Sequence, residues 1–329
     1  MSLSLPNFKI FVSIASYRDS ECSNTIQDLF EKAKYPNRLF VGCCQQNKEN
    51  ASEEECLPKN FQWKHQIRMI YIPYSEAKGP TYARYICSTL HKDESFFFQI
   101  DSHNKFVQNW DDLCVQMFLD LSNRIGHSKI ILSHYPADIR DYKVHSDKNE
   151  KVPTIESANY NEKGILKLNA AVFRSVNDIP QKTHFIAAGF LFTTKEWLKE
   201  VPFDPSLDYL FVGEEILLTL RSFTSGWDVF TPNRNIIYHY YYRKNCPKIW
   251  FDQIKKPKKA IEKVLKLQNG DMNHMWGLGD TRPIQEFYQK IDRHQVNDIF
   301  LKKTPTFEII IFCLIFLLYI ARNFLYVSK

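Results

Sequence analysis

Residues 96–103 read FFFQIDSH, an apolar run that ends in a carboxylate and an imidazole. A short aromatic and apolar run of this kind is typical of a buried strand. Side chains two positions apart in an extended segment lie on the same side, so Asp101 and His103 could bind one cation. A carboxylate with an imidazole suits a borderline ion such as Mn²⁺, and Mg²⁺ is the alternative. The competing interpretation is an Asp that caps a turn beside an exposed histidine.

Strands and helices alternate on both sides of this run. The residue patterns predict strands over 8–14, 39–44, 67–72 and 129–134, and helices over 26–33, 79–90 and 110–121. The alternation predicts an α/β fold with a doubly wound, mostly parallel sheet, in which ligands bind outside the carboxyl ends of the strands. After a long polar excursion over 136–183, we expect strands over 184–192, 228–231 and 235–240, a helix over 214–223, and a lysine-rich helical pattern over 243–266.

Composition excludes several classes of protein. The chain has 329 residues, of which 44% are hydrophobic and 24% charged, as in a globular protein rather than a disordered one. No G-x-G-x-x-G or P-loop pattern occurs, which argues against glycine-loop dinucleotide or phosphate binding. A net charge of +6 suits an anionic ligand but is too small and dispersed to indicate nucleic acid.

The eight cysteines include no C-x-x-C pair, so a zinc ribbon or redox motif is not expected. Several of them lie in apolar runs, where a free cysteine behaves as a small buried hydrophobe. The first residues do not resemble a secretory signal. We therefore predict reduced thiols and a cytosolic location.

The last segment differs from the rest of the chain. Residues 309–321 are apolar and uncharged, and 324–327 extend the run beyond Arg322. A spanning helix needs about 20 apolar residues, so the stretch could cross a membrane if Arg322 snorkels to the interface. The alternative is a helix that lies on the protein or in the interface plane. We expect a main domain over 1–300 and a hydrophobic tail over 301–329 that forms a C-terminal helix and membrane anchor, with Lys302 and Lys303 keeping the main domain cytosolic.

Other polar residues follow the predicted strands or begin the predicted helices. Ser13 lies at the end of the first predicted strand, Tyr17 and Arg18 follow it, and the three could line a base pocket. Gly79 and Pro80 open a helix that carries Arg84, and both a helix start and an arginine can bind an anion.

The second half of the chain supplies further candidates. His239, in a late aromatic strand, is a candidate third metal ligand, although a lone histidine is more often packed in a core. Arg243 could neutralise a phosphate or be a surface charge. Glu214 and Glu215 start a helix, where the macrodipole favours acidic groups. One of the two could instead face an acceptor hydroxyl, and the sequence does not say which.

Seven short motifs occur in order between about residue 8 and residue 245: SIASYRD (13–19), GPTYAR (79–84), FQIDSH (98–103), AGF (188–190), GEE (213–215), SGWDVFTP (225–232) and HYYYR (239–243). Taken together, these motifs resemble the polypeptide α-N-acetylglucosaminyltransferases, whose best-known members act in the cytosol on a hydroxyproline of a ubiquitin-ligase adaptor.

The resemblance implies a GT-A-type, retaining glycosyltransferase. It would move GlcNAc from UDP-GlcNAc to a hydroxyl of a protein acceptor (hydroxyproline, Ser or Thr), with Mn²⁺ or Mg²⁺ as the divalent cofactor. By this analogy, the metal ligands are Asp101, His103 and His239, and the nucleotide-binding residues are Ser13, Tyr17, Arg18 and Arg84. The sugar-pocket residues are Ala188, Gly189 and Phe190, and the acceptor-facing residue is Glu214 or Glu215.

Three alternatives remain at this stage. The same fold could use another UDP-sugar or a glycan acceptor. The chain could also be a membrane-tethered module that binds a sugar nucleotide without turnover, although all three expected metal ligands are present. A nucleotidyltransferase or metal hydrolase would usually need a denser carboxylate cluster than Asp101 supplies.

Overall fold

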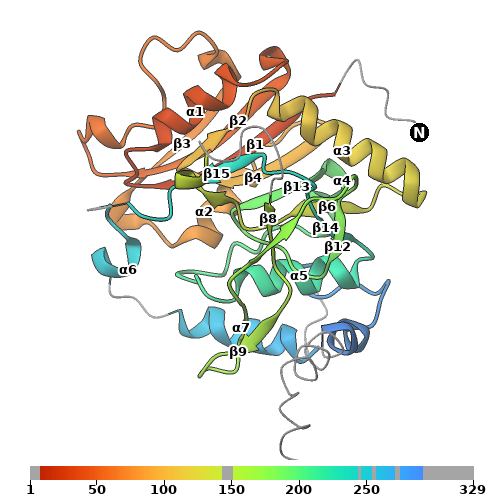
Figure 1. Ribbon diagram of the computed structural model, residues 1–329. Coiled ribbons are helices and arrows are strands. Elements are labelled where there is room, and N and C mark those ends of the chain that lie inside the picture. Colours follow the sequence, from red (N-terminus) through yellow and green to blue (C-terminus); the bar gives the residue numbers. More distant parts are fainter. Residues whose placement is uncertain (1–7, 143–150, 244–245, 254–256, 271–274, 292–329) are drawn as a thin grey trace, which may run out of the picture. The chain divides into compact units, whose positions relative to one another are not determined.

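The computed structural model describes residues 8–142, 151–243, 246–253, 257–270 and 275–291 (Figure 1). The chain divides into two compact units, 1–287 and 288–329. The fold and the site described here lie in the first unit.

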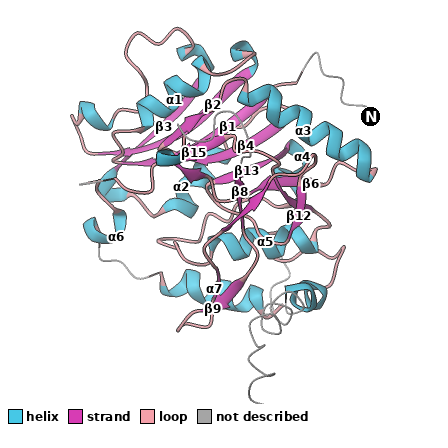
Figure 2. Cartoon of the chain, viewed as in Figure 1, coloured by secondary structure: helices cyan, strands magenta, loops and turns pink. Residues whose placement is uncertain are grey.

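A central sheet of eight strands forms the framework (Figure 2). In spatial order the strands are β12 (Gln181–Thr183), β14 (Asp228–Thr231), β6 (Ile130–Ser133), β13 (Phe190–Thr194), β4 (Phe96–Asp101), β1 (Ile10–Tyr17), β2 (Leu39–Asn47) and β3 (Ile67–Pro73). The four strands from β4 to β3 are parallel, as are β14 and β6. β13 is antiparallel to both of its neighbours, and β12 is antiparallel to β14. The predicted large, mostly parallel sheet is confirmed.

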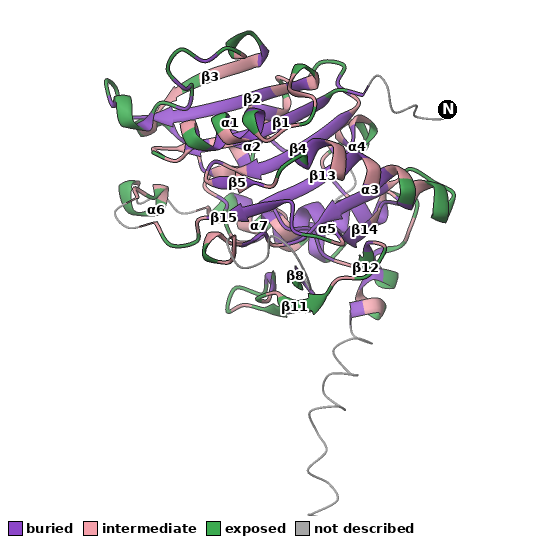
Figure 3. Cartoon of the chain, turned by 45° about the horizontal axis from the view of Figure 1, so that its top comes forward, coloured by how far each residue is buried: buried purple, intermediate pink, exposed green. Residues whose placement is uncertain are grey.

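Helices cover both faces of the sheet because its central strands are apolar on both sides. Along β1, Ile10, Val12 and Ile14 pack in one core cluster with α1 (Cys22–Glu31) and α3 (Trp110–Ile125). Phe11, between them, points to the other face and joins a second cluster with α4 (Lys195–Glu200) and α5 (Glu214–Thr224). α2 (Pro80–Ser88) packs against β1 and β2. Figure 3 shows these strands as a buried layer.

Short strands and helices complete the unit. They are β5 (Asn104–Phe106), β15 (Ile237–His239) and β7 (Ala137–Asp138) in one small sheet, β8 (Lys151–Thr154) paired with β11 (Val172–Ser175), β9 (Ala158–Tyr160) paired with β10 (Leu166–Leu168), and the helices α6 (Ile249–Asp252) and α7 (Lys258–Gln268). The expected excursion over 136–183 therefore contains short strand pairs in its described part, and its residues 166–168 reach the site below.

Two predictions are wrong. The strand expected over 184–192 begins only at Phe190, because the small residues before it form a turn that closes on Phe190 through a bridge from Ala187. The thiols of Cys22 and Cys56 are not free, since the two residues form a disulfide with their Cα atoms 4.7 Å apart. They lie 34 residues apart in the sequence and in no spacing motif, so only the packing of α1 against the loop after β2 brings them together.

The apolar tail over 309–327 lies outside the described residues. Within the described ranges, no helix is long and apolar enough to cross a membrane. The anchor and the cytosolic location stay predictions.

Candidate functional site

The site is a cleft of about 440 Å³ next to a smaller compartment of about 140 Å³. The cleft lies between the end of β4, the turn before β13 and the start of α5, whereas the end of β1 lines the smaller compartment. The two share a set of lining residues: Pro80, Arg84, Asp101, His103, Phe211, Arg243, Lys248 and Trp250. A ligand with two parts could therefore extend from one space into the other.

Asp101, His103 and His239 meet at the boundary between the two compartments, as expected from the sequence. β4 ends at Asp101 and β5 begins at Asn104, which leaves His103 in the tight connection between them. β15 pairs with β5 so that His239 stands opposite Asn104. The ligand atoms of the three side chains lie within 4.8 Å of one another, and His239 Nε2 is 3.2 Å from Asp101 Oδ2.

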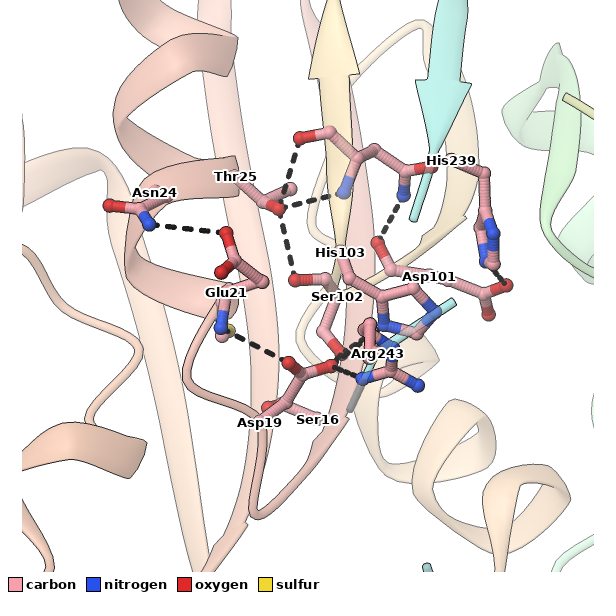
Figure 4. A network of polar contacts seen from close by, with 12 residues as sticks. Ser16, Asp19, Glu21, Asn24, Thr25, Asp101, Ser102, His103, His239 and Arg243 are labelled. Atoms are coloured by element: carbon pink, nitrogen blue, oxygen red, sulfur yellow. Dashed lines mark hydrogen bonds and ion pairs between the residues drawn. The ribbon is translucent and has the colours of Figure 1, made fainter. Parts of the chain in front are cut away.

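The chemistry of this group fits a divalent cation. One carboxylate and two imidazoles are donors suited to Mn²⁺. The ring of His103 is fixed by a 2.7 Å hydrogen bond from Nδ1 to Asp19, the kind of carboxylate partner that metal-binding histidines commonly have, and this leaves Nε2 free to bind a cation (Figure 4).

The charges around the cluster favour the forms that bind a metal. Burial alone would raise the pKa of Asp101, but the hydrogen bond with His239 and the charge of Arg84 outweigh burial and hold this pKa well below its usual range. Burial lowers the pKa of His103, which keeps its imidazole neutral despite the nearby carboxylates. An ionised aspartate and a neutral histidine are the states that bind metals.

Arg84 is buried and bridges two carboxylates. Its Nη2 donates to Asp101 Oδ1 at 2.7 Å, and its Nη1 donates to Glu214. Although burial opposes its charge, Glu214 and Asp101 raise the pKa of Arg84 further above its ordinary value. Because one oxygen of Asp101 is held by Arg84 and the other lies near His239, the orientation of this carboxylate is set from two sides.

The structure separates Glu214 from Glu215. Both line the larger cleft at the start of α5, where Gly213 adopts a left-handed backbone. Glu214 pairs with Arg84, whereas Glu215 accepts hydrogen bonds from the Tyr135 hydroxyl (2.7 Å) and the Ala188 N–H (3.1 Å). Burial raises the pKa of Glu215, and these two hydrogen bonds offset the rise only in part. Burial likewise raises the pKa of Glu214 against the effect of Arg84.

The turn before β13 forms part of the cleft wall. Ala188 and Gly189 both line the cleft, whereas Phe190 is fully buried beneath it. A Cβ atom at Gly189 would lie 2.9 Å from Asp101 Oδ2, so only glycine leaves this carboxylate undisturbed.

Of the other predicted nucleotide-binding residues, some line the two spaces and some do not. Tyr17 lines the smaller compartment, and its hydroxyl donates to Asp252 at 2.8 Å. Arg18 donates to the same carboxylate and to Glu54, beside the compartment wall. Arg243 lines both spaces. Ser13 is fully buried within β1 and is not among the residues that line either space.

Several lining residues were not singled out from the sequence. Asp19 is the last residue of SIASYRD, directly after β1, and its place after a strand was a usable signal. Tyr135 follows β6 in the same way. Lys248 and Trp250 lie within the lysine-rich pattern expected over 243–266, whereas no sequence pattern marked Phe211.

A family model and one solved structure with a TM-score above 0.5 agree with this picture of the fold. A family model described as "Glycosyltransferase (GlcNAc)" matches residues 9–63 and 53–268. No curated protein matches the chain. The structure is similar to the crystal structure of GalNAc-T7 with UDP, GalNAc and Mn²⁺, at 12% identity and a TM-score of 0.56, over 88% of this chain and 55% of that one. It is also similar to TarS 1–349 of S. aureus in complex with UDP-GlcNAc, at 13% identity and a TM-score of 0.47, over 81% and 68% of the two chains.

The chain thus spans about half the length of the GalNAc-T7 chain. At such low identity the likeness concerns the fold, and it supports the expected GT-A type.

Proposed function

Because the chain belongs to the GlcNAc glycosyltransferase family, we propose that it is a metal-dependent transferase. It moves GlcNAc from UDP-GlcNAc to a hydroxyl of a protein (hydroxyproline, Ser or Thr), with retention of the anomeric configuration. The observation that carries the proposal is the Asp101, His103 and His239 cluster at the boundary between a smaller and a larger compartment.

The two compartments suit the two halves of a sugar nucleotide. The smaller one, lined by Tyr17 and Arg243, takes the UDP half, and the larger cleft takes the sugar and the acceptor. A divalent cation on the three ligands would neutralise the negative charge that grows on the departing diphosphate. Arg243 adds a second positive charge on the same side. The Mn²⁺ and UDP in the GalNAc-T7 structure support the choice of cation and of a UDP-sugar donor.

The two carboxylates at the start of α5 take different roles in this proposal. Glu214 holds Arg84, which in turn orients Asp101, so Glu214 acts through the metal site. Glu215 faces the cleft with Tyr135 and the Ala188 N–H, next to the space for the sugar. Glu215 is therefore the carboxylate that contacts the sugar or the acceptor hydroxyl.

The experiment is a UDP-release assay with a panel of UDP-sugars in Mn²⁺, Mg²⁺ or EDTA. Slow hydrolysis of the donor needs no known acceptor, so the assay works before the acceptor is identified. Release from UDP-GlcNAc that EDTA and His103→Ala abolish is the expected result. His127→Ala is the matched control, because His127 is an exposed histidine that pairs with Asp228, away from the residues that line the cleft.

Other outcomes would identify another function. Release from a different UDP-sugar would keep the enzyme class and change the donor. If a folded protein releases UDP from no sugar and also binds none of them, the transferase proposal is wrong. Binding without release, with or without candidate protein and glycan acceptors, would favour an inactive binding module.

A further inference from the structure

Asp19 is a buried carboxylate at which several parts of the site meet. Its side chain is 2% exposed and lies just beyond the end of β1. Oδ2 accepts hydrogen bonds from His103 Nδ1 (2.7 Å), Ser102 Oγ (2.7 Å) and Arg243 Nη1 (2.6 Å), and Oδ1 accepts from the Glu21 N–H (3.1 Å) (Figure 4). The residues joined in this way come from the β1–α1 turn, the β4–β5 turn and the segment after β15.

A buried carboxylate is costly unless charged or strongly polar donors compensate it. At Asp19 the compensating groups are an expected metal ligand, His103, and a cation that lines both compartments, Arg243. A residue needed only to close the β1–α1 turn would require the Glu21 N–H and neither of the other two. The contacts of Asp19 thus point toward the site rather than toward the local backbone.

We propose that Asp19 is a positioning residue that orients His103 and Arg243 together, so that both cation affinity and UDP affinity depend on it. The inference rests on the proposed function and adds a residue that contacts neither the cation nor the transferred sugar. By holding Nδ1, Asp19 selects the ring orientation and tautomer in which Nε2 is free to bind the metal. By holding Nη1 of Arg243, it fixes a positive charge beside the compartment assigned to the diphosphate.

The test measures Mn²⁺ binding directly, by calorimetry or by the EPR signal of free Mn²⁺, without nucleotide. Removing the carboxylate partner of a metal-bound histidine usually weakens metal binding about 10- to 100-fold. We expect a Kd increase in that range for Asp19→Ala. Asp19→Asn should show a smaller increase, because its amide oxygen still accepts a hydrogen bond from Nδ1. Asp28→Asn is the matched control, since Asp28 accepts a hydrogen bond from the Phe106 N–H at 2.6 Å and belongs to the same region but not to the cleft.

UDP binding at saturating Mn²⁺ tests the second half of the proposal. Arg243→Gln should weaken UDP binding while leaving Mn²⁺ affinity without nucleotide within about twofold. Asp19→Ala should weaken UDP binding as well, and combining it with Arg243→Gln should add little further loss, because the two residues act through one contact.

Unchanged Mn²⁺ affinity in Asp19→Ala would overturn the inference, provided that the variant keeps the wild-type circular dichroism and that His103→Ala loses binding. In that case the metal site of the proposed function would stand. No Mn²⁺ binding by the wild-type protein would overturn both. If Asp19→Ala does not fold, Asp19→Asn decides by the same comparison.

Discussion

Gly189 lies against the carboxylate of Asp101, where an added Cβ would come within 2.9 Å of Oδ2. That oxygen cannot yield freely, because Arg84 holds the other oxygen and His239 lies 3.2 Å away. Misplacing a reacting group by a fraction of an ångström to one ångström costs up to about 100-fold in rate. Gly189→Ala should therefore lower kcat/KM for UDP release about 10- to 100-fold and leave the melting temperature nearly unchanged.

Gly126→Ala is the control for Gly189→Ala, because it should lower stability and leave activity unchanged. Gly126 ends α3 with a left-handed backbone (φ +77°), and a Cβ there would meet no atom within 4 Å. Alanine in this conformation costs about 1–2 kcal/mol of stability through backbone strain alone. This variant should have a lower melting temperature than the wild type and an unchanged kcat/KM for UDP release. Equal losses of activity in the two variants would contradict the assigned role of Gly189.

Arg84 is the buried cation between Asp101 and Glu214. Arg84→Met keeps the volume and leaves two carboxylates without their partner, a loss that typically costs about 3–5 kcal/mol. Adding Glu214→Gln should restore part of the free energy of unfolding, since one of the two uncompensated charges is then gone. Urea denaturation of the single and double variants measures both effects.

Arg140→Met is the control for that series. Arg140 pairs with Asp138, but its side chain is 81% exposed, and exposed ion pairs contribute at most about 1 kcal/mol. If Arg84→Met costs no more than Arg140→Met, Arg84 is not the cation that compensates this part of the cleft.

At the scale of elements, α1 and the loop between β2 and β3 are joined by the Cys22–Cys56 disulfide. The same loop supplies Glu54, which binds Arg18. Chain-entropy estimates give a cross-link over 34 residues a stabilisation of about 3–4 kcal/mol. Cys56→Ser should lose about that much in urea denaturation, and a reductant should destabilise the wild type to the same degree but leave the variant unaffected.

Cys246→Ser controls for the substitution itself, because Cys246 is a free, partly exposed cysteine. It should leave the unfolding midpoint unchanged. A reductant effect that persists in Cys56→Ser would mean that this disulfide does not carry the stabilisation.

At the scale of the whole molecule, the ionisation of Glu215 makes the free energy of unfolding depend on pH. Its pKa in the folded protein is raised above the ordinary value of 4.5. Between pH 4.5 and the raised value the folded protein binds more protons than the unfolded chain, so this group makes stability fall as pH rises. Every tenfold difference in proton affinity between the folded and unfolded states corresponds to about 1.4 kcal/mol. In the proposed function, the ionised carboxylate of Glu215 is the form that contacts the sugar or the acceptor hydroxyl.

Glu215→Gln should therefore gain stability relative to wild type as pH rises through this window, and the gain should be constant above it. Its transferase activity should be low at every pH, whereas wild-type activity should rise through the same window. Urea midpoints and UDP-release rates at several pH values from mildly acidic to mildly alkaline measure both trends. Wild-type and variant midpoints that differ equally at all pH values would show that Glu215 does not titrate in this range.

The sequence anticipated much of this molecule. The strand ending at Asp101, the helix beginning at Pro80 and the helix beginning at Glu214 lie where apolar periodicity and helix-start residues predicted them. Such features depend on neighbours along the chain. The strand expected over 184–192 begins only at Phe190, because the small residues before it form a turn that a bridge between Ala187 and Phe190 closes.

The candidate site also combines features that the sequence indicated with features that only the tertiary structure decided. The spacing and residue types of Asp101 and His103 indicated a candidate cation site, because ligand chemistry is a property of each side chain, and the family resemblance added His239 as the third ligand. The pairing of β15 with β5 decided that His239 reaches Asp101, which lies 138 residues earlier in the chain. Tertiary packing alone also distinguished Glu215 from Glu214, joined Cys22 to Cys56 and brought Asp19 into contact with His103. These outcomes depend on contacts between segments far apart in the chain, which local patterns do not encode.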